Sequence, residues 1–372
     1  MKIVYFIEGT FNSGGIERIV IEKANWLSLK GHDVTIITSE QNGRSDFFPL
    51  KGVKRIDMDL MFTNIPENNF INKFFRRKKL LAKEKELIIK YINKLSPDIV
   101  ISTFRYEKNI LPKIKDKSKK IVEIHFSRWF RLQRNRKGIG GLIDRFLTWQ
   151  DIRNLSQYDK FICLTEEDKQ HWKGIKNIDV INNFIELKTK TPAPLLNNKC
   201  IAVGRLVYQK GFDRLIEIWK EVHKKYPEWK LTIYGDGPLK GKLNKMISEC
   251  RLKDVIKICE PTKEIYEKYL ESSILLMTSH YEGLPMVMLE AMEAGLPIVS
   301  FDFKCGPKDV IQEGENGFII KDGDIIKMAE AIGKLIESQD LRSTLGKNSF
   351  KMAKKYSKEA IMAQWENLFM NL

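Results

Sequence analysis

A chain of 372 residues, 43% of them apolar, is long enough to form two domains with substantial cores. Its composition excludes an extensively disordered protein, and the lack of any run of about 18 apolar residues argues against a transmembrane helix. The net charge of +16 at pH 7 predicts an anionic partner.

Nearly all of the excess positive charge lies in the first half of the chain. Residues 1–190 hold 37 Lys and Arg against 23 Asp and Glu, whereas residues 191–372 hold 27 against 25. This imbalance predicts that the first half meets a membrane surface, a phosphorylated acceptor or a nucleic acid. Because the sequence contains no known nucleic-acid-binding module, we expect no nucleic acid partner.

The sequence also indicates a cytoplasmic location. Its first residues, MKIVYFIEG, lack the basic region and the small-residue cleavage site of a secretory signal peptide. The five cysteines are scattered and form no C-x-x-C pair, so we expect reduced thiols and no zinc site.

The first half alternates strand-like runs with helical segments. Residues 16–31 have helical spacing and end at Gly31, a typical C-terminal stop. This alternation predicts a parallel sheet with helices on both faces. The runs that predict strands are KIVYFIEG (2–9), HDVTIITS (32–39), SPDIVIST (96–103), KIVEIHF (120–126) and KFICLTE (160–166).

The second half repeats the pattern after a linker at residues 188–198, which contains two prolines among polar residues. We therefore expect an α/β protein with two Rossmann-like domains, residues 1–188 and 189–356. A final helix over residues 357–372, with Ser357 as its N-cap, is expected to pack back onto the first domain. The runs that predict strands are KCIAVGR (199–205), WKLTIYGDG (229–237), VIKICE (255–260), SSILLMTS (272–279), GLPIVSFD (295–302) and NGFIIKDG (316–323).

Two cations follow the first strand of the second half. Arg205 and Lys210 lie in GRLVYQKG (204–211), between a strand and the helix that Gly211 opens. Cations beside a helix N-terminus suit a phosphate group, because backbone N–H groups and the helix dipole also favour an anion. From spacing alone, it is equally supported that the two residues are solvated surface cations and form no phosphate site.

Two carboxylates lie in an apolar strand-to-helix junction, at Glu282 and Glu290 in HYEGLPMVMLEAM (280–292). A helix starting near Pro285 would place both carboxylates near one face, where they could accept hydrogen bonds from the hydroxyls of a sugar or ribose. The alternative is that Glu282 only caps the helix and that Glu290 lies on the surface. The apolar residues between them disfavour this alternative.

In this order and spacing, the motifs resemble the signature of the retaining glycosyltransferases of family 4, which have the two-domain GT-B fold. The resemblance covers most of the chain, and its strongest part is the Arg/Lys loop followed by the paired glutamates and glycine motifs. The segments that carry it are FNSGGIERIV (11–20), EIHFS (123–127), CLTEEDK (163–169), GRLVYQKG (204–211), SHYEGLPMVMLEAMEAGLPIVSFD (279–302), CGPKDVI (305–311) and ENGFII (315–320).

The resemblance implies how a nucleotide-sugar donor would be held. Arg205 and Lys210 would bind the diphosphate and neutralise the leaving nucleotide. Glu282 would contact the donor sugar, and Glu290 would accept hydrogen bonds from the ribose.

The resemblance also implies contacts from loops of both domains. Two glycines would close a loop over the donor, a histidine would lie near the transferred sugar, a segment after residue 257 would hold the base, and two N–H groups would bind phosphate or sugar. The two glycines are Gly14 and Gly15, and the histidine is His125. The segment that would hold the base contains Glu260 and Pro261, and the two N–H groups are those of Gly283 and Leu284. From its position alone, His125 is equally compatible with a packed loop residue.

Two acidic pairs superficially resemble metal ligands. Asp57 and Asp59 lie on a strand, and Asp322 and Asp324 lie in a turn, so we expect structural roles for both pairs. Enzymes with the GT-B fold generally stabilise the leaving group without a metal, and we expect no metal or other cofactor. Cys305 stands where the family commonly has Gly, and we expect it to narrow the sugar pocket.

Two cationic segments of the first half suggest contact with an anionic membrane. Residues 72–95 combine an apolar stripe with a Lys/Arg face, and residues 126–149 carry Trp129 and Phe130 among five cations that precede the glycines of this segment. Aromatic residues interleaved with cations suit the headgroup region of a bilayer. We expect peripheral association with the inner face of the plasma membrane, although the first segment also has the spacing to pack on the sheet.

Together these features predict a retaining hexosyltransferase that uses a nucleotide sugar, expected to be a UDP-sugar. Its acceptor would be a membrane-linked glycan in capsule, O-antigen or lipid-linked oligosaccharide synthesis. A UDP-sugar 2-epimerase of the same fold is an alternative that would need no acceptor. An NAD-dependent oxidoreductase is disfavoured because EGTFNSGG (8–15) does not match G-x-G-x-x-G and no acidic residue directly ends the next strand.

Overall fold

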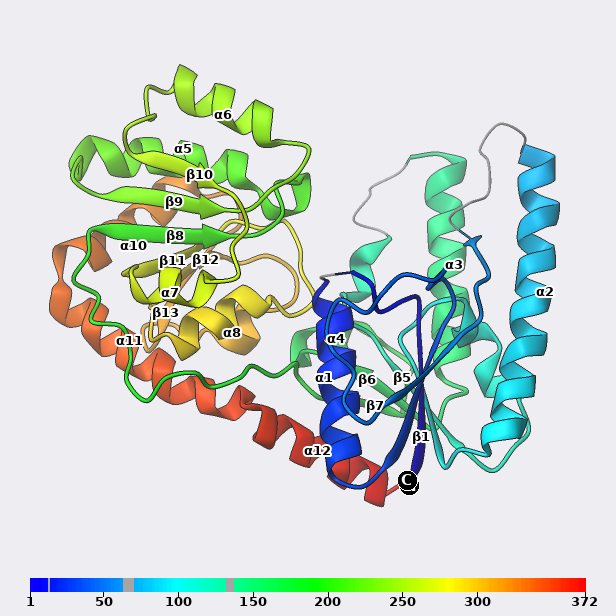
Figure 1. Cartoon of the computed structure of the whole chain (residues 1–372). Helices are drawn as coiled ribbons and strands as arrows, with labels where there is room; N and C mark the ends of the chain where they lie inside the picture. Colours follow the sequence, from blue (N-terminus) through cyan, green and yellow to red (C-terminus); the bar gives the residue numbers. More distant parts are fainter. Residues whose placement is uncertain (13, 63–69, 132–136) are drawn as a thin grey trace. The chain divides into compact units, whose positions relative to one another are not determined.

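The computed structural model describes residues 1–12, 14–62, 70–131 and 137–372 (Figure 1). The chain forms two compact units. Unit 1 comprises residues 1–164, 169–181 and 362–372, and unit 2 comprises residues 165–168 and 182–361. The main division therefore falls at residue 181, earlier than the linker suggested, because the N–H of Ile185 donates to the carbonyl of Tyr356 at 2.9 Å within unit 2.

Unit 1 is built on a parallel sheet with the order β3-β2-β1-β4-β5-β6-β7. The central strand is buried along residues 3–7, as expected for a strand covered on both faces. The strand expected around Asp57 and Asp59 is β3, but it ends at Asp57 and leaves Asp59 beyond it. Strand β7 was not predicted, because IDV has only three residues. The strands are β1 (Lys2–Ile7), β2 (Asp33–Thr38), β3 (Lys54–Asp57), β4 (Ile99–Ser102), β5 (Lys119–Glu123), β6 (Lys160–Cys163) and β7 (Ile178–Val180).

The last helix, α12 (Lys358–Met370), begins at its predicted N-cap, where the Ser357 hydroxyl accepts a hydrogen bond from the N–H of Ala360. Its final residues belong to unit 1. There the indole N–H of Trp26 donates to Glu366 at 3.3 Å. The other helices of the first half are α1 (Gly15–Leu29), α2 (Phe70–Leu95), α3 (Ile139–Leu155) and the short α4 (Glu166–His171).

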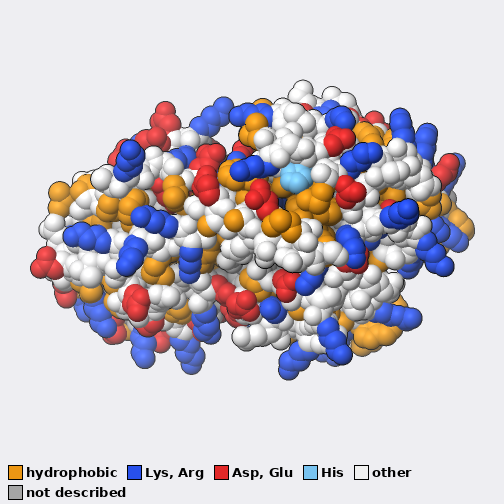
Figure 2. Space-filling model, turned by 90° about the horizontal axis from the view of Figure 1, so that it is seen from below, with side chains coloured by type: hydrophobic (Ala, Val, Ile, Leu, Met, Phe, Trp, Pro, Cys, Tyr) orange, Lys and Arg blue, Asp and Glu red, His pale blue; other side chains and the backbone are white. Residues whose placement is uncertain are grey.

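Helix α2 carries exposed cations and one buried acid. Lys and Arg side chains gather over the part of unit 1 where this helix lies (Figure 2). Glu84, in contrast, is only 1% exposed. Burial, together with the nearby carboxylates of Glu107 and Glu40, raises the pKa of Glu84 to about 8. Glu84 is therefore mostly protonated at neutral pH, which lowers the cost of burying it.

Unit 2 is built on a second parallel sheet, with the order β10-β9-β8-β11-β12-β13. All six of its strands were predicted from the apolar runs. They are β8 (Lys199–Val203), β9 (Lys230–Tyr234), β10 (Ile256–Cys259), β11 (Ile274–Met277), β12 (Ile298–Phe301) and β13 (Gly317–Ile320). The helices are α5 (Phe212–Lys225), α6 (Lys240–Glu249), α7 (Ile265–Leu270), α8 (Met286–Glu293), α9 (Pro307–Val310), α10 (Ile325–Glu337) and α11 (Gln339–Ala353).

Both sheets confirm the predicted Rossmann-like α/β class. In each sheet the direction in which successive strands are added reverses once, between β1 and β4 in unit 1 and between β8 and β11 in unit 2. Open α/β sheets bind ligands beyond the carboxyl ends of their strands at this switch point. In unit 2, the loops that follow β8 and β11 therefore form the expected position for a ligand.

Candidate active site

The loop after β8 lies directly against the end of β11. It runs from Gly204 to Gly211, where α5 begins, and Gly211 has a left-handed φ of 61°. A Cβ atom added to Gly211 would lie 2.1 Å from the carbonyl oxygen of Thr278. Only glycine combines this backbone conformation with so close an approach, so Gly211 fixes the loop beside the next strand.

This loop brings Lys210 to Glu282. The ammonium of Lys210 lies 2.7 Å from Oε1 of Glu282, although the two residues are 72 positions apart in the sequence. Both side chains are largely buried, with exposed fractions of 15% and 9%. The pairing explains how a carboxylate is accommodated in an apolar junction, since an unpaired charge there would be costly.

Two further side chains hold Glu282 in place. The hydroxyl of Ser279 donates to Oε1 at 2.8 Å, and the amide of Gln209 donates to Oε2 at 3.1 Å. The same amide donates to the carbonyl of Tyr281 at 2.9 Å. Neither Gln209 nor Ser279 was predicted, although Gln209 directly precedes Lys210 and Ser279 lies three residues before Glu282.

Arg205 lies on the same loop as Lys210 and is exposed. Within the described residues, no carboxylate lies within ion-pair distance of its guanidinium. Its charge is therefore available to an anion, next to the N-terminus of the 14-residue helix α5.

Glu290 has a different partner from Glu282. It lies half-buried on α8, and the buried hydroxyl of Tyr269 donates to Oε2 of Glu290 at 3.0 Å. Burial and the nearby Glu290 carboxylate raise the pKa of Tyr269 well above its ordinary value, so Tyr269 remains a donor. No local sequence pattern pointed to Tyr269, which lies on a separate helix, α7.

The remaining predicted residues of unit 2 follow the carboxyl ends of two strands. Gly283 and Leu284 come between Glu282 and α8, with Leu284 buried and Gly283 half-buried. Glu260 and Pro261 directly follow β10 and are exposed, and Glu260 pairs with Lys240. Since the carboxyl ends of parallel strands share one edge of the sheet, these loops lie on the same edge as Lys210 and Glu282.

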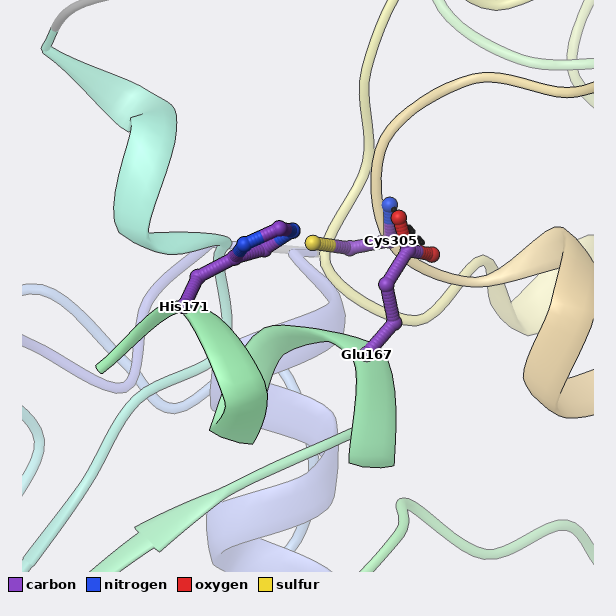
Figure 3. A group of neighbouring side chains, drawn as sticks. All are labelled: Glu167, His171 and Cys305. Carbon is purple, nitrogen blue, oxygen red and sulfur yellow. Dashed lines mark hydrogen bonds between the residues drawn. The ribbon is translucent and has the colours of Figure 1, made fainter. Parts of the chain in front are cut away.

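Cys305 adopts a conformation that usually requires glycine. Its φ is 65°, and its thiol is buried. The backbone N–H donates to the carboxylate of Glu167 at 3.1 Å (Figure 3), and the thiol donates to Asp168 at 3.5 Å. Burial, with the carboxylates of Asp168 and Glu167, raises the pKa of this thiol well above its ordinary value. Cys305 is thus an anchored thiol and not a nucleophile.

In unit 1, Gly14 and Gly15 lie at the N-terminus of α1, with Gly14 as the N-cap. His125 follows the carboxyl end of β5 by two residues, and 4% of its side chain is exposed. Gly15 is thus the first residue of the helix, whereas His125 lies on the loop that follows β5.

A buried carboxylate lies beside His125. Oε2 of Glu123 is 3.7 Å from Nε2 of His125 and also pairs with the ammonium of Lys23. Burial opposes ionisation of Glu123, but Lys23 and His125 outweigh that effect and lower the pKa of Glu123 to about 2. The Lys23 ammonium also lies 4.0 Å from the ring centroid of Trp365 on α12. An ionised Glu123 can orient the imidazole of His125.

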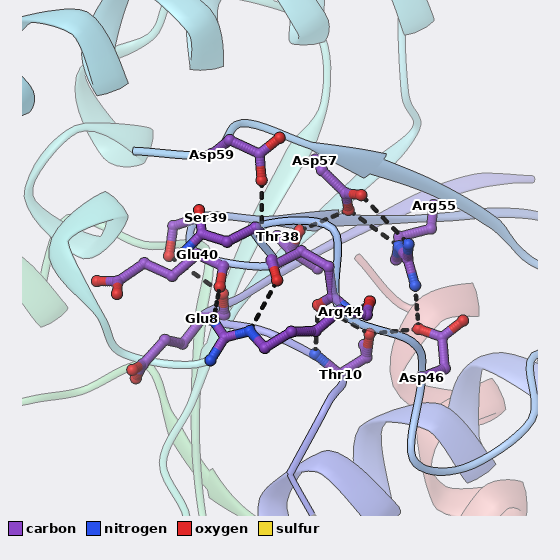
Figure 4. A network of polar contacts seen from close by, with 12 residues as sticks. Glu8, Thr10, Thr38, Ser39, Glu40, Arg44, Asp46, Arg55, Asp57 and Asp59 are labelled. Carbon is purple, nitrogen blue, oxygen red and sulfur yellow. Dashed lines mark hydrogen bonds and ion pairs between the residues drawn. The ribbon is translucent and has the colours of Figure 1, made fainter. Parts of the chain in front are cut away.

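The acidic residues Asp57 and Asp59 belong to a polar network beyond the ends of β1, β2 and β3 (Figure 4). Asp57 accepts hydrogen bonds from Arg55 at 2.9 Å and from the Thr38 hydroxyl at 2.8 Å. Asp59 accepts one from the N–H of Asn42 at 2.7 Å. These contacts tie loops of unit 1 together.

The second acidic pair is also engaged within the protein. Asp322 pairs with Arg214 at 2.6 Å. Asp324 is the N-cap of α10, and its carboxylate accepts a hydrogen bond from the N–H of Lys327.

Comparison with known proteins places the whole chain in one family. Residues 13–189 match the family model described as Glycosyltransferase Family 4, and residues 183–352 match Glycosyl transferases group 1. An uncharacterized glycosyltransferase of Haemophilus influenzae is 31% identical over 377 residues, covering 99% of each chain. The amylovoran biosynthesis glycosyltransferase AmsD of Erwinia amylovora is 28% identical, again covering 99% of each chain.

A solved structure agrees on the fold. TarM of S. aureus, crystallised with UDP and alpha-GlcNAc-glycerol, superimposes with a TM-score of 0.78 over 99% of each chain at 19% identity. The sequence matches, the two switch-point sheets and this likeness lead to one conclusion. The chain belongs to glycosyltransferase family 4, has the GT-B fold and is a glycosyltransferase.

Proposed function

We propose that this glycosyltransferase moves a hexose from a UDP-sugar to a membrane-linked glycan, with retention of configuration, during cell-surface polysaccharide synthesis. The observation that carries the proposal is the Lys210–Glu282 pair at the switch point of unit 2. It places a cation and a carboxylate side by side where α/β sheets bind ligands, and a sugar diphosphate offers partners for both.

Glu282 is suited to hold the sugar. An ionised carboxylate has about four lone-pair sites, and three donors, Lys210, Ser279 and Gln209, already bind this one. The remaining capacity suits a sugar hydroxyl, and the three protein donors would fix the direction in which the carboxylate points. Glu290, held by Tyr269, would accept from the ribose in the same way.

Lys210 and Arg205 are suited to stabilise the leaving group. When the bond between the sugar and UDP breaks, negative charge grows on the bridging phosphate oxygen. Fixed cations aimed at that oxygen stabilise the transition state without reorganising. The proposal therefore assigns this role to the two cations and includes no metal or other cofactor.

The acceptor and the location rest on different observations. AmsD, similar along its whole length, is named for the synthesis of a polysaccharide, amylovoran. The excess positive charge of residues 1–190 suits anionic lipids and lipid-linked phosphates. We therefore place the enzyme at the cytoplasmic face of the plasma membrane, with unit 1 receiving the acceptor.

Calorimetry with UDP, GDP and ADP, followed by a panel of UDP-hexoses, tests the donor. The proposal expects UDP-sugars to bind and Lys210→Ala to weaken them, whereas Lys220→Ala, which removes an exposed cation of α5, should not. Tight binding of GDP or ADP instead of UDP would contradict the choice of donor.

Transfer with the preferred donor to membrane extracts, with the product's anomeric configuration determined by NMR, tests the reaction. The expected product keeps the donor's configuration. An inverted product would contradict retention, and conversion of the UDP-sugar without any acceptor would favour the epimerase.

A further inference from the structure

Helix α3 carries its apolar residues on the outside. Five large apolar side chains of this helix are between 49% and 77% exposed. Their spacing of three or four residues places them along one face. They are Ile139, Leu142, Ile143, Phe146 and Trp149, and we call them the α3 stripe.

The opposite face of α3 is buried and mostly polar. Asp151 pairs with Arg131 and lies 3.5 Å from the ammonium of Lys108. The amide of Asn154 donates to Asn109 at 2.6 Å. These contacts fix the rotation of the helix, because rolling the stripe inward would break them and leave charged groups unpaired. The exposure of the stripe is therefore built into the fold of unit 1.

The exposed charges of α3 are all positive. Arg145 and Arg153 are exposed on α3, and Lys137 is exposed just before it. The two acids of the helix, Asp144 and Asp151, are both buried. Helix α3 thus presents bulky apolar residues and cations to the outside, and no exposed acid.

The start of α2 has the same character. Phe74 and Phe75 are 60% and 63% exposed. Four exposed cations, residues 76–79, follow them. Helices α2 and α3 begin at the same end of unit 1 (Figure 1). Among the described residues, no helix is both long enough and apolar enough to cross a bilayer.

We propose that the α3 stripe, together with Phe74 and Phe75, docks on an anionic lipid bilayer. Apolar and aromatic side chains would enter the boundary between headgroups and acyl chains, and the flanking cations would meet lipid phosphates. A second copy of the chain suits this face less well, because a symmetric contact would gather Arg145 and Arg153 of both copies in one interface, where α3 has no exposed acid to pair with them. An exposed apolar patch of this kind marks an interaction surface.

The sequence favoured Trp129 and Phe130 as the aromatic residues that meet the membrane, and the structure points to different ones. Trp129 and Phe130 are half-buried in the 3₁₀ turn η4 (Arg128–Phe130). The ring of Phe130 lies 4.3 Å from that of Phe126, and the ring of Trp129 lies 5.3 Å from that of His171. Both rings are committed to packing within unit 1, so the aromatic residues offered to the bilayer are Phe146 and Trp149.

This inference rests on the proposed function, because docking through unit 1 would bring the enzyme to a membrane-linked acceptor. Its test, however, needs neither donor nor acceptor. Co-sedimentation of the full chain with phosphatidylcholine vesicles, with or without phosphatidylglycerol, measures docking alone. If the wild-type chain does not bind vesicles but transfers sugar to a detergent-solubilised acceptor, only the docking proposal is overturned. If it binds vesicles but transfers no sugar, only the proposed function is overturned.

Variants of the stripe provide the decisive comparison. The double substitution Phe146→Glu with Trp149→Glu should lower vesicle binding at least 10-fold, and Phe146→Ser with Trp149→Ser gives the same test without added charge. Leu29→Glu with Met370→Glu is the matched control, since these unit 1 side chains are 77% and 74% exposed but lie on other helices. Unchanged binding of the folded stripe variants, or equal loss in the control, would overturn the proposal.

The cations provide a second comparison. Arg145→Gln and Arg153→Gln should each weaken binding to anionic vesicles about five-fold at low salt, and less at high salt. Lys115→Gln with Lys117→Gln, at exposed positions elsewhere in unit 1, is the control. Equal binding to neutral and anionic vesicles would contradict the claim that the surface recognises anionic lipids. A stripe-dependent dimer in analytical ultracentrifugation, without vesicle binding, would assign the face to a second copy instead.

Discussion

Lys210 and Glu282 form a 2.7 Å ion pair between the loop after β8 and the loop after β11. The pair joins the two strands at which the strand order of unit 2 reverses. A phosphate arriving at this loop would compete with Glu282 for the ammonium, while Ser279 and Gln209 would still hold the carboxylate. Donor binding is thus expected to share Lys210 between the diphosphate and Glu282.

Replacing Lys210 with alanine should cost catalysis more than binding. In the proposed reaction, the negative charge that Lys210 meets grows as UDP leaves, so Lys210 should contribute more in the transition state than in the bound donor. Loss of one preorganised group of this kind typically lowers kcat by about 10²–10³-fold. The measurement is kcat and the Kd for UDP in parallel, with Lys220→Ala as control. If kcat and the affinity for UDP fell by the same factor, Lys210 would contribute no more to the transition state than to binding.

Removing the carboxylate of Glu290 should weaken nucleotide binding. Hydrogen bonds to charged groups contribute roughly 1.5–3 kcal/mol, so Glu290→Ala should raise the Kd for UDP by about 10- to 150-fold. Tyr269→Phe, which removes the hydroxyl that holds Glu290, should have a smaller effect. Calorimetry with UDP checks both variants, and unchanged affinity in Glu290→Ala would place the ribose elsewhere.

Stability should fall with rising pH because of Glu84. Its pKa is raised from 4.5 to about 8, so the unfolded chain releases this proton before the folded protein does. The folded state therefore loses stability progressively between about pH 4.5 and pH 8. Glu84→Gln should be more stable than wild type at pH 9, on the order of a few kcal/mol, and similar at pH 4. Urea unfolding measures this, with the exposed Glu86→Gln on the same helix as control. A constant difference across this range would contradict the raised pKa.

Transfer should not depend on a divalent metal. Arg205 and Lys210 meet the charge of the leaving group in the proposed reaction, so activity in excess EDTA should match activity in its absence. If EDTA abolished transfer and Mg²⁺ or Mn²⁺ restored it, a metal would be stabilising the leaving group in place of the two cations.

The sequence predicted the architecture well because buried parallel strands are continuous apolar runs. It also placed Lys210 and Glu282 beyond the carboxyl ends of strands, because both follow such runs. It could not predict Tyr269 as the partner of Glu290, since that contact depends on how α7 packs against α8. It also misplaced the exposed aromatic residues. Helical spacing shows that α3 has an apolar face, but only the contacts of Asp151 and Asn154 show which face turns inward.

The most direct test of the proposed reaction is Glu282→Gln, which keeps the shape of the side chain and removes its charge. The measurement is the Kd for UDP together with the rate of sugar transfer from the preferred UDP-sugar. We predict that transfer is lost while UDP affinity changes by less than about 3-fold, because the proposal assigns Glu282 to the sugar and not to the nucleotide. Transfer at the wild-type rate, or loss of UDP binding in parallel with transfer, would contradict the assignment of this carboxylate to the sugar.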